Sequence, residues 1–195
     1  MDDGTTLLTE EIARCEVCKV HLGHPPRPVV QLGSAARIVV IGQAPGSKVH
    51  ESGIPWNDDS GNRLREWTGI GYETFYNRNK VALLPMGFCY PGKGDGADLP
   101  PRPECAPLWH ERAMSLLSSR KLTLLVGIHA QTYYLKDSSF SNMTETVRAF
   151  SRFGPETFPL PHPSWRSSGW MKRNPWFEAE TLPALRKSIG AALSK

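Results

Sequence analysis

Runs of mainly apolar residues recur along the chain and predict four buried strands. These runs are Ile38–Ile41, Lys80–Leu84, Leu122–Ile128 and Glu156–Leu160. An unbroken apolar run, in place of alternating apolar and polar positions, is typical of a parallel strand that is covered on both faces. The run Ile38–Ile41 is the clearest, because each of its residues is Ile or Val.

The segments between these runs carry apolar residues at helical spacing. The expected helices lie at Leu7–Arg14, from near Ser60 to Trp67, at Cys105–Arg120, at His129–Leu135, around Met143–Phe150, and from Asn174 onward. The polar segment 138–153 is expected to begin as a loop. Strands that alternate with helices predict an α/β fold. We therefore expect a single domain over residues 1–195, a three-layer α/β/α structure with a central, mainly parallel four-stranded sheet.

Composition restricts the class of protein. With 39% hydrophobic and 22% charged residues, the chain is typical of a globular protein and not of a disordered one. Its first residues are acidic and polar, unlike a secretory signal, and its longest apolar run is too short to cross a bilayer. We expect a cytoplasmic protein without a membrane partner, and we expect it to be a monomer. The net charge of +4 is compatible with nucleic acid but too small to indicate it.

The first predicted strand runs directly into a turn of small residues. These residues are Gly42, Gln43, Ala44, Pro45 and Gly46. Backbone N–H groups of such a turn can approach a ligand closely, and the carboxyl ends of parallel strands are where open α/β sheets bind ligands. Trp56 and the carboxylates of Asp58 and Asp59 follow, just before a predicted helix. An ordinary turn and a helix-capping aspartate are the alternatives.

The four cysteines form one close pair and two separate positions, at Cys15, Cys18, Cys89 and Cys105. In a cytoplasmic protein this pattern indicates a metal site in place of disulfides. A thioredoxin-like pair would lie between a strand and a helix, whereas Cys15 and Cys18 precede the first strand. Four thiolates suit tetrahedral zinc or a [4Fe–4S] cluster, and four unrelated buried thiols are the remaining alternative.

The last predicted strand ends near a second candidate site, at His162. Because both follow parallel strands, His162 is expected to face the same crevice as the Gly42–Gly46 turn. The candidate DNA-binding residues that follow are Ser164, Trp165, Arg166, Lys172 and Arg173. Aromatic rings mixed with cations, on a loop over 165–173, suit insertion into a nucleic acid together with phosphate contacts. A solvated loop held by tryptophan packing is the alternative.

Long loops are also predicted. Many of the seventeen prolines fall within 85–107 and 155–175, which indicates ordered loops on a compact scaffold. Loops of that length are more often functional than not.

The stretch from Gly42 to Gly61 resembles the first motif of the uracil-DNA glycosylase superfamily, in a layout closest to its iron–sulfur branch, family 4. That pattern reads Gly-Glu-Ala-Pro-Gly, then Gly-x-Pro-Phe, then a small residue and Gly. Here Gly42–Gly46, Gly53–Trp56 and Ser60–Gly61 match it without a gap. His162–Ser164, which reads His-Pro-Ser, is similar to the second motif. The resemblance covers nearly the whole chain and implies that fold, a DNA partner and, on the four cysteines, a [4Fe–4S] cluster, with zinc second.

The activity that the resemblance implies is that of a monofunctional DNA glycosylase of base-excision repair. Such an enzyme hydrolyses the N-glycosidic bond of a flipped uracil or of another deaminated or damaged base. Trp56, in the place of the family's Phe, would stack on the base, and the 43–46 backbone and His162 would donate hydrogen bonds to it. A related branch, family 5, uses an Asp just before a Ser-Gly pair, so the carboxylate would be Asp59 or Asp58, with Asp59 slightly preferred.

Three positions depart from the family 4 pattern. Gln43 replaces its Glu, Pro85 stands in the place of its base-reading Asn, and His50 replaces an acidic residue. Without that amide, paired amide hydrogen bonds cannot select uracil. A DNA glycosylase remains the first hypothesis. The second is a nucleic-acid-binding homologue without base release, which Gln43 and Pro85 favour. The third, a hydrolase of small nucleotides or nucleobases, gives no reason for the aromatic and basic segment after His162.

Overall fold

Four strands form one sheet in the computed structural model, which describes residues 4–136, 140 and 142–194. They are β1 (Ile38–Ile41), β2 (Val81–Leu83), β3 (Leu122–Val126) and β4 (Thr157–Leu160). All neighbours are parallel, in the order β2-β1-β3-β4. In this register Val39 lies between Ala82 of β2 and Thr123 of β3. All four predicted strands and the parallel sheet are confirmed.

Helices follow the strands in the expected alternation. The α-helices are α1 (Gly4–Ala13), α2 (Ser47–Ser52), α3 (Asp59–Thr68), α4 (Tyr72–Phe75), α5 (Cys105–Leu116), α6 (Ile128–Tyr134), α7 (Met143–Arg148), α8 (Ser167–Arg173) and α9 (Leu182–Leu193). Short 3-10 helices η1 (Lys19–His21) and η2 (Phe150–Phe153) and a π-helical segment η3 (Phe177–Thr181) complete the elements. Residues 137–139 and 141, in or beside the predicted loop 138–153, lie outside the described residues.

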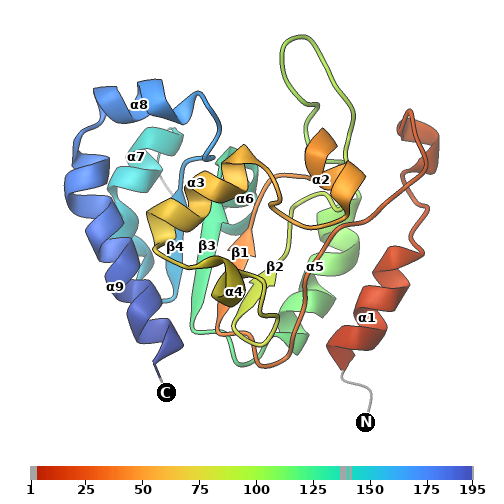
Figure 1. Cartoon of the computed structure of the whole chain (residues 1–195), viewed down its shortest axis with the longest axis horizontal. Helices are drawn as coiled ribbons and strands as arrows, with labels where there is room; N and C mark the ends of the chain where they lie inside the picture. The colour runs from red at the N-terminus through yellow and green to blue at the C-terminus, as the bar shows by residue number, and fades with distance from the viewer. Residues whose placement is uncertain (1–3, 137–139, 141, 195) are drawn as a thin grey trace.

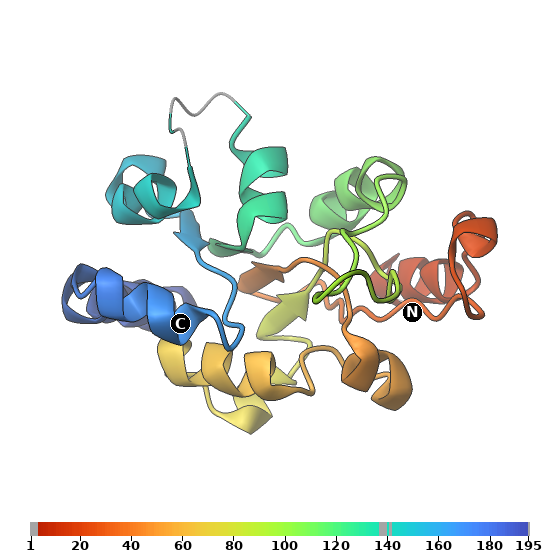
Figure 2. The same cartoon turned by 90° about the horizontal axis from the view of Figure 1, so that it is seen from above.

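Helices cover the two faces of the sheet (Figure 2), and each face packs into its own hydrophobic layer. Ile38 and Val40 of β1 point into the layer formed with α3 and α9, where Phe177 is fully buried. Val39 and Ile41 point the other way, against α1 and α5. Successive side chains of a strand point to opposite faces, so β1 needs apolar residues at every position to be covered on both sides. The three-layer α/β/α fold is confirmed.

Residues 165–173 were expected to form a loop, and the structure corrects this, because most of them form helix α8. Trp170 fixes the helix: its Nε1 donates to Thr144 Oγ1 at 2.9 Å, and its ring packs edge-on against Phe177 at 5.2 Å. Asn174 Nδ2 donates to the Trp170 carbonyl at 2.8 Å. The short helices α2 and α4 were not predicted, since neither is long enough to show an apolar period.

The order in which the strands are connected indicates the edge of the sheet at which a ligand site is expected. The chain passes from β1 to β2 on one side and then crosses back to β3 on the other side of β1, and such a switch point opens a crevice at the carboxyl ends of the strands. Helices α2 and α8 and the loop after β2 lie at this edge, whereas both chain ends lie at the opposite edge (Figure 1). No helix in the described part of the chain is both long and apolar enough to span a membrane.

Candidate functional site

A cavity of about 530 Å³ lies at the carboxyl edge of the sheet. The sequence-predicted residues that line it are Gly42, Gln43, Ala44, Pro45, Gly46, Trp56, Asp58, His162, Ser164, Trp165 and Arg166. The lining formed by the described residues does not include Asp59, Lys172 or Arg173. The structure therefore brings together two segments that are more than a hundred residues apart in the sequence.

The turn after β1 presents free backbone donors to this cavity. Its carbonyls are occupied: Gly42 O accepts from Met86 N and Gln43 O from Gly87 N, both at 2.9 Å. No backbone carbonyl in the described part of the chain accepts from the N–H groups of Gln43, Ala44 or Gly46. Unpaired N–H groups in a cavity wall are suited to oxygen atoms of a ligand.

Trp56 forms the floor of the cavity and is held in an unusual conformation. Its φ is +57°, and among the described residues it is the only one other than glycine with a positive φ. This conformation costs a bulky residue about 1–3 kcal/mol. Its neighbours leave it no room: a Cβ on Gly42 would stand 2.6 Å from Trp56 Cζ2, and one on Gly61 would stand 1.7 Å from Trp56 O. The indole stacks on His162, with ring centres 5.9 Å apart.

His162 is held as a neutral imidazole. Burial lowers its pKa to about 4, and this effect outweighs the negative charge of Asp98, which acts in the opposite direction. His129, at the start of α6, lowers it further. A neutral imidazole at physiological pH is a hydrogen-bond donor and not a source of positive charge. The sequence could not show this, because the pKa depends on the surroundings of the ring.

The two adjacent aspartates have different surroundings. Asp58 caps α3, since its Oδ1 accepts from Gly61 N at 2.8 Å, and burial raises its pKa. Asp58 lines the cavity with Gly46, and its Oδ2 lies 3.9 Å from the point where a Cβ on Gly46 would stand. The side chain of Asp59 is 89% exposed and pairs with Lys48 at 2.9 Å. Asp58 is thus both a helix cap and a cavity carboxylate, whereas Asp59 faces solvent.

The segment after His162 is anchored from α3. Arg63 Nη1 donates to Ser164 O and, at 2.9 Å, to Ser167 Oγ. The ring of Trp165 is 76% exposed, and the Arg166 guanidinium lies over it at 5.2 Å. The segment therefore presents an exposed indole and a cation at the mouth of the cavity. Lys172 and Arg173 are exposed at the end of α8.

Pro85 and His50, two of the positions that depart from the family 4 pattern, lie in different parts of the structure. Pro85 lines the cavity, and its carbonyl accepts from the buried His110 Nε2 at 3.0 Å. His50 lies on α2, and its ring packs against that of His24 at 4.3 Å. Pro85 therefore forms part of the wall without a side-chain donor or acceptor.

Several cavity residues were not predicted from the sequence. Lys93, Asp98 and Leu99, all in the loop after β2, line the cavity, and Arg63 anchors the opposite wall. The proline-rich composition of 85–107 marked this loop as functional, but gave no sign of which side chain would turn inward. The partner of Arg63 is more than a hundred residues away, so no local pattern marks it.

The cysteines lie near one another at the side of the domain. All four are free, and Cys18, Cys89 and Cys105 share a buried cluster with Leu22. Cys18 and Cys105 are in hydrogen-bond contact, and Cys89 is close enough to Cys15 and Cys18 for their charges to interact. Burial raises the pKa of Cys89 to about 11 and that of Cys105 to about 12.

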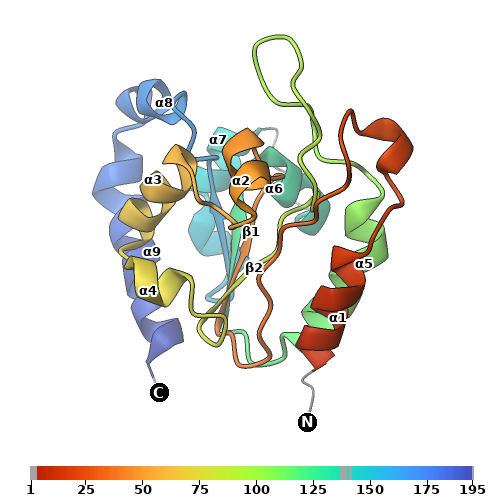
Figure 3. The same ribbon diagram turned by 45° about the vertical axis from the view of Figure 1, so that its right-hand side comes forward.

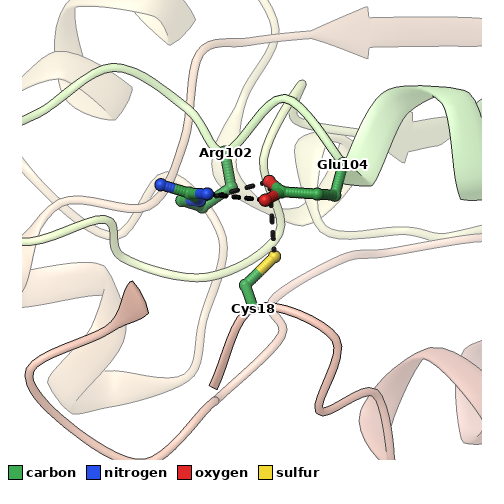
Figure 4. A network of polar contacts seen from close by, with 3 residues as sticks. All are labelled: Cys18, Arg102 and Glu104. Atoms are coloured by element: carbon green, nitrogen blue, oxygen red, sulfur yellow. Dashed lines mark hydrogen bonds and ion pairs between the residues drawn. The ribbon is translucent and has the colours of Figure 1, made fainter. Parts of the chain in front are cut away.

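Charged groups border this cluster (Figure 4). Cys18 Sγ donates to Glu104 Oε2 at 3.7 Å, and Glu104 pairs with Arg102 at 2.5 Å. In the described part of the chain, no three Cys, His, Asp or Glu side chains meet at metal-binding spacing. The donor set of four gathered thiols is nevertheless the one that a [4Fe–4S] cluster uses.

Comparison with protein families assigns the chain to a known group. The model of the uracil DNA glycosylase superfamily matches residues 30–186, which include the cavity residues named above and the whole sheet. The match covers most of the 195 residues. It agrees with the parallel three-layer fold and with a site at the carboxyl edge of the sheet. The chain belongs to the uracil DNA glycosylase superfamily.

Proposed function

We propose that this protein is a monofunctional DNA glycosylase that hydrolyses the N-glycosidic bond of a flipped uracil or of another deaminated or damaged base. One observation carries the proposal: the turn after β1, Trp56, Asp58 and His162 line a single cavity. Membership of the superfamily supports it. The proposal includes a cytoplasmic monomer, in keeping with four free cysteines.

The cavity residues fit the steps of base excision. The indole of Trp56 offers a stacking surface for the base, and the N–H groups of residues 43–46 can donate to its carbonyl oxygens. As the C1′–N bond breaks, its electron pair leaves with the base. Neutral His162 donates a hydrogen bond to the oxygen on which that charge gathers. Water attacks C1′, and the carboxylate of Asp58 accepts a proton from it.

The geometry favours Asp58 over Asp59 for this role. Asp58 Oδ2 faces the cavity, and burial raises the pKa of the carboxyl, which makes it a better proton acceptor. Asp59 is exposed and engaged with Lys48. The resemblance to family 5 had favoured Asp59 slightly, since an Asp just before a Ser-Gly pair is the carboxylate there. The sequence alone did not show which side of α3 faces the cavity.

DNA contacts are assigned to the segment after His162. Ser164, Trp165 and Arg166 lie at the cavity mouth, with the exposed indole placed to fill the space that a flipped nucleotide leaves. Lys172 and Arg173 at the end of α8 are exposed cations that suit the phosphate backbone.

The test is a base-release assay. Single- and double-stranded oligonucleotides with uracil, hypoxanthine, xanthine or hydroxymethyluracil are incubated with the protein and then cleaved by alkali at abasic sites. We expect strand cleavage on at least one of them. Asp58→Asn and His162→Ala are expected to slow it by about 100-fold or more, and Asp59→Asn by less than about threefold. Equal loss in Asp58→Asn and Asp59→Asn would contradict the assignment.

One observation favours a second function, binding without base release. Gln43 and Pro85 both line the cavity at positions where the resemblance leads one to expect a carboxylate and an amide. A protein of this kind would bind the modified oligonucleotides and cleave none of them. The same assay, combined with a binding measurement, separates the two functions.

We also propose that Cys15, Cys18, Cys89 and Cys105 hold a [4Fe–4S] cluster, with zinc as the alternative. Their free thiols gather from the N-terminal segment and from the loop after β2, two regions far apart in the sequence. When bound, the cluster would cross-link these segments and so stabilise the wall of the cavity. Brown protein with about four iron and four sulfide per chain is expected. Colourless protein with about one zinc would replace this assignment.

A further inference from the structure

The loop after β2 contains a hairpin that stands beside the cavity, which we call the 92–99 hairpin. Gly94 N donates to Ala97 O at 2.8 Å and Leu99 N to Gly92 O at 2.9 Å, and Lys93 pairs with Asp98 in an antiparallel bridge. The loop projects from the same edge of the sheet as α2 and α8 (Figure 3). The hairpin contributes Lys93, Asp98 and Leu99 to the cavity lining.

Asp98 brings a second carboxylate to the cavity. Its Oδ2 lies 3.5 Å from the point where a Cβ on Gly46 would stand, and Asp58 Oδ2 lies 3.9 Å from the same point. The two carboxylates therefore flank the end of the turn after β1, although they come from different segments of the chain. The negative charge of Asp98 also reaches the ring of His162. Two carboxylates and one imidazole thus share one cavity.

Polar contacts of 3.4 Å tether Asp98 and its hairpin beside the cavity. Tyr90 Oη donates to Asp98 Oδ1 at 3.4 Å, and Arg166 Nη2 donates to Gly96 O of the same hairpin at 3.4 Å. Within the described residues, no Lys, Arg or His side chain forms an ion pair with Asp98. A carboxylate in the cavity lining without such a partner is suited to stabilise a cation nearby.

We propose that Asp98 is a further catalytic residue, which contacts the sugar of the flipped nucleotide and stabilises the positive charge that develops there. This inference rests on the proposed glycosylase function. The base lies in the cavity on Trp56, so the sugar stays at the mouth, beside the hairpin. The C1′–N bond breaks with its electrons on the base, water adds to C1′, and its proton goes to Asp58. Asp98 exchanges no proton and acts through its charge.

The hairpin offers a matched control. Asp95 lies on the same hairpin and is exposed like Asp98, but it does not line the cavity that the described residues form. Asp98→Asn and Asp95→Asn remove the same charge from the same element with almost no change in shape. We expect Asp98→Asn to slow single-turnover base release by about 100-fold, with DNA affinity within about threefold of the wild type. Asp95→Asn is expected to leave both within about twofold.

A second readout does not depend on activity. The groups that face His162 are Asp98, which raises its pKa, His129, which lowers it, and the uncharged ring of Trp56. The His162 imidazole is titrated by NMR and assigned with His162→Gln. Asp98→Asn is expected to lower the midpoint, and Asp95→Asn to leave it unchanged.

The outcomes separate the two proposals. If the wild type releases a base and Asp98→Asn matches Asp95→Asn in rate and titration, Asp98 is not catalytic and the glycosylase proposal stands. If the wild type releases no base from any of the oligonucleotides, the glycosylase proposal is overturned, and the catalytic role of Asp98 is overturned with it.

Discussion

The two halves of the cavity are held in different ways. The fixed half, residues 42–61 with 85–87, is interlocked by short hydrogen bonds, by a helix cap and by glycines that touch Trp56 directly. The 92–99 hairpin is tied to the rest of the site by two hydrogen bonds of 3.4 Å. The fixed half sets the shape of the cavity, and the hairpin adds charged groups to it, so the two contributions can be tested by separate substitutions. Substitutions that crowd the fixed half are expected to reduce stability, whereas removal of the Asp98 carboxylate from the hairpin is expected to reduce activity alone.

The strongest test of the fixed half is Gly61→Ala. The new methyl group would stand 1.7 Å from Trp56 O, so α3 or the floor must move. We expect a loss of about 3 kcal/mol or more in the free energy of unfolding. Gly190→Ala, in α9 with open space around it, is the matched control and is expected to gain about 0.5–1 kcal/mol. Urea denaturation measures both, and a similar small effect of the two substitutions would show that the floor is not interlocked.

The dependence of stability on pH tests the same half, because the buried His110 donates to the Pro85 carbonyl. This residue is 1% exposed, and burial lowers its pKa to about 4 from an ordinary value of 6.5. The unfolded chain therefore binds the proton more readily, so stability is expected to fall as the pH drops from about 6.5 to 4. A shift of this size corresponds to about 3 kcal/mol.

His110→Gln provides the reference for this pH dependence. The variant keeps a donor for Pro85 O and does not titrate. It is expected to be less stable at pH 7 but to lose less stability on acidification than the wild type. Other groups titrate in both proteins, so the difference in urea midpoints between pH 7 and pH 4.5 isolates His110. Identical losses would contradict the lowered pKa of His110 in the folded protein.

The smallest expected change in stability belongs to the hairpin side. Arg166→Gln removes the bond to Gly96 and the cation over Trp165, and is expected to change the free energy of unfolding by less than about 0.5 kcal/mol. Affinity for oligonucleotides should fall by about three- to tenfold. Lys172→Gln removes the same charge away from the cavity, so it should weaken binding less. Fluorescence anisotropy compares them, and a large loss of stability in Arg166→Gln would remove the contrast between the two halves.

The sheet was predictable because a strand that is buried on both faces needs apolar residues at every position, and such a run is visible in the sequence. Ile38–Ile41 has no polar residue, and its bounds in the structure are those expected from the sequence. The short helices α2 and α4 show no such pattern. Helix α8 was read as a loop, because it is held by the distant contact between Trp170 and Thr144.

The site residues that belong to contiguous motifs were predictable from the sequence. Those whose place depends on the path of the folded chain were not. The turn after β1, Trp56 and His162 were expected to meet, and they line one cavity. The choice between Asp58 and Asp59 depends on which side of α3 faces that cavity, and Asp98 depends on the path of a long loop. The neutral state of His162 depends on its burial, which a single sequence does not encode locally.

The contacts of Trp56 with Gly42 and Gly61 also constrain how this protein can change over generations. Each partner blocks a different substitution: the ring blocks any side chain at position 42, and the carbonyl blocks any at position 61. A smaller aromatic residue at position 56 would relieve only the first. Mutational routes to a differently shaped base pocket therefore begin at position 56: Gly42 becomes variable only after it has changed, whereas the backbone carbonyl keeps Gly61 invariant.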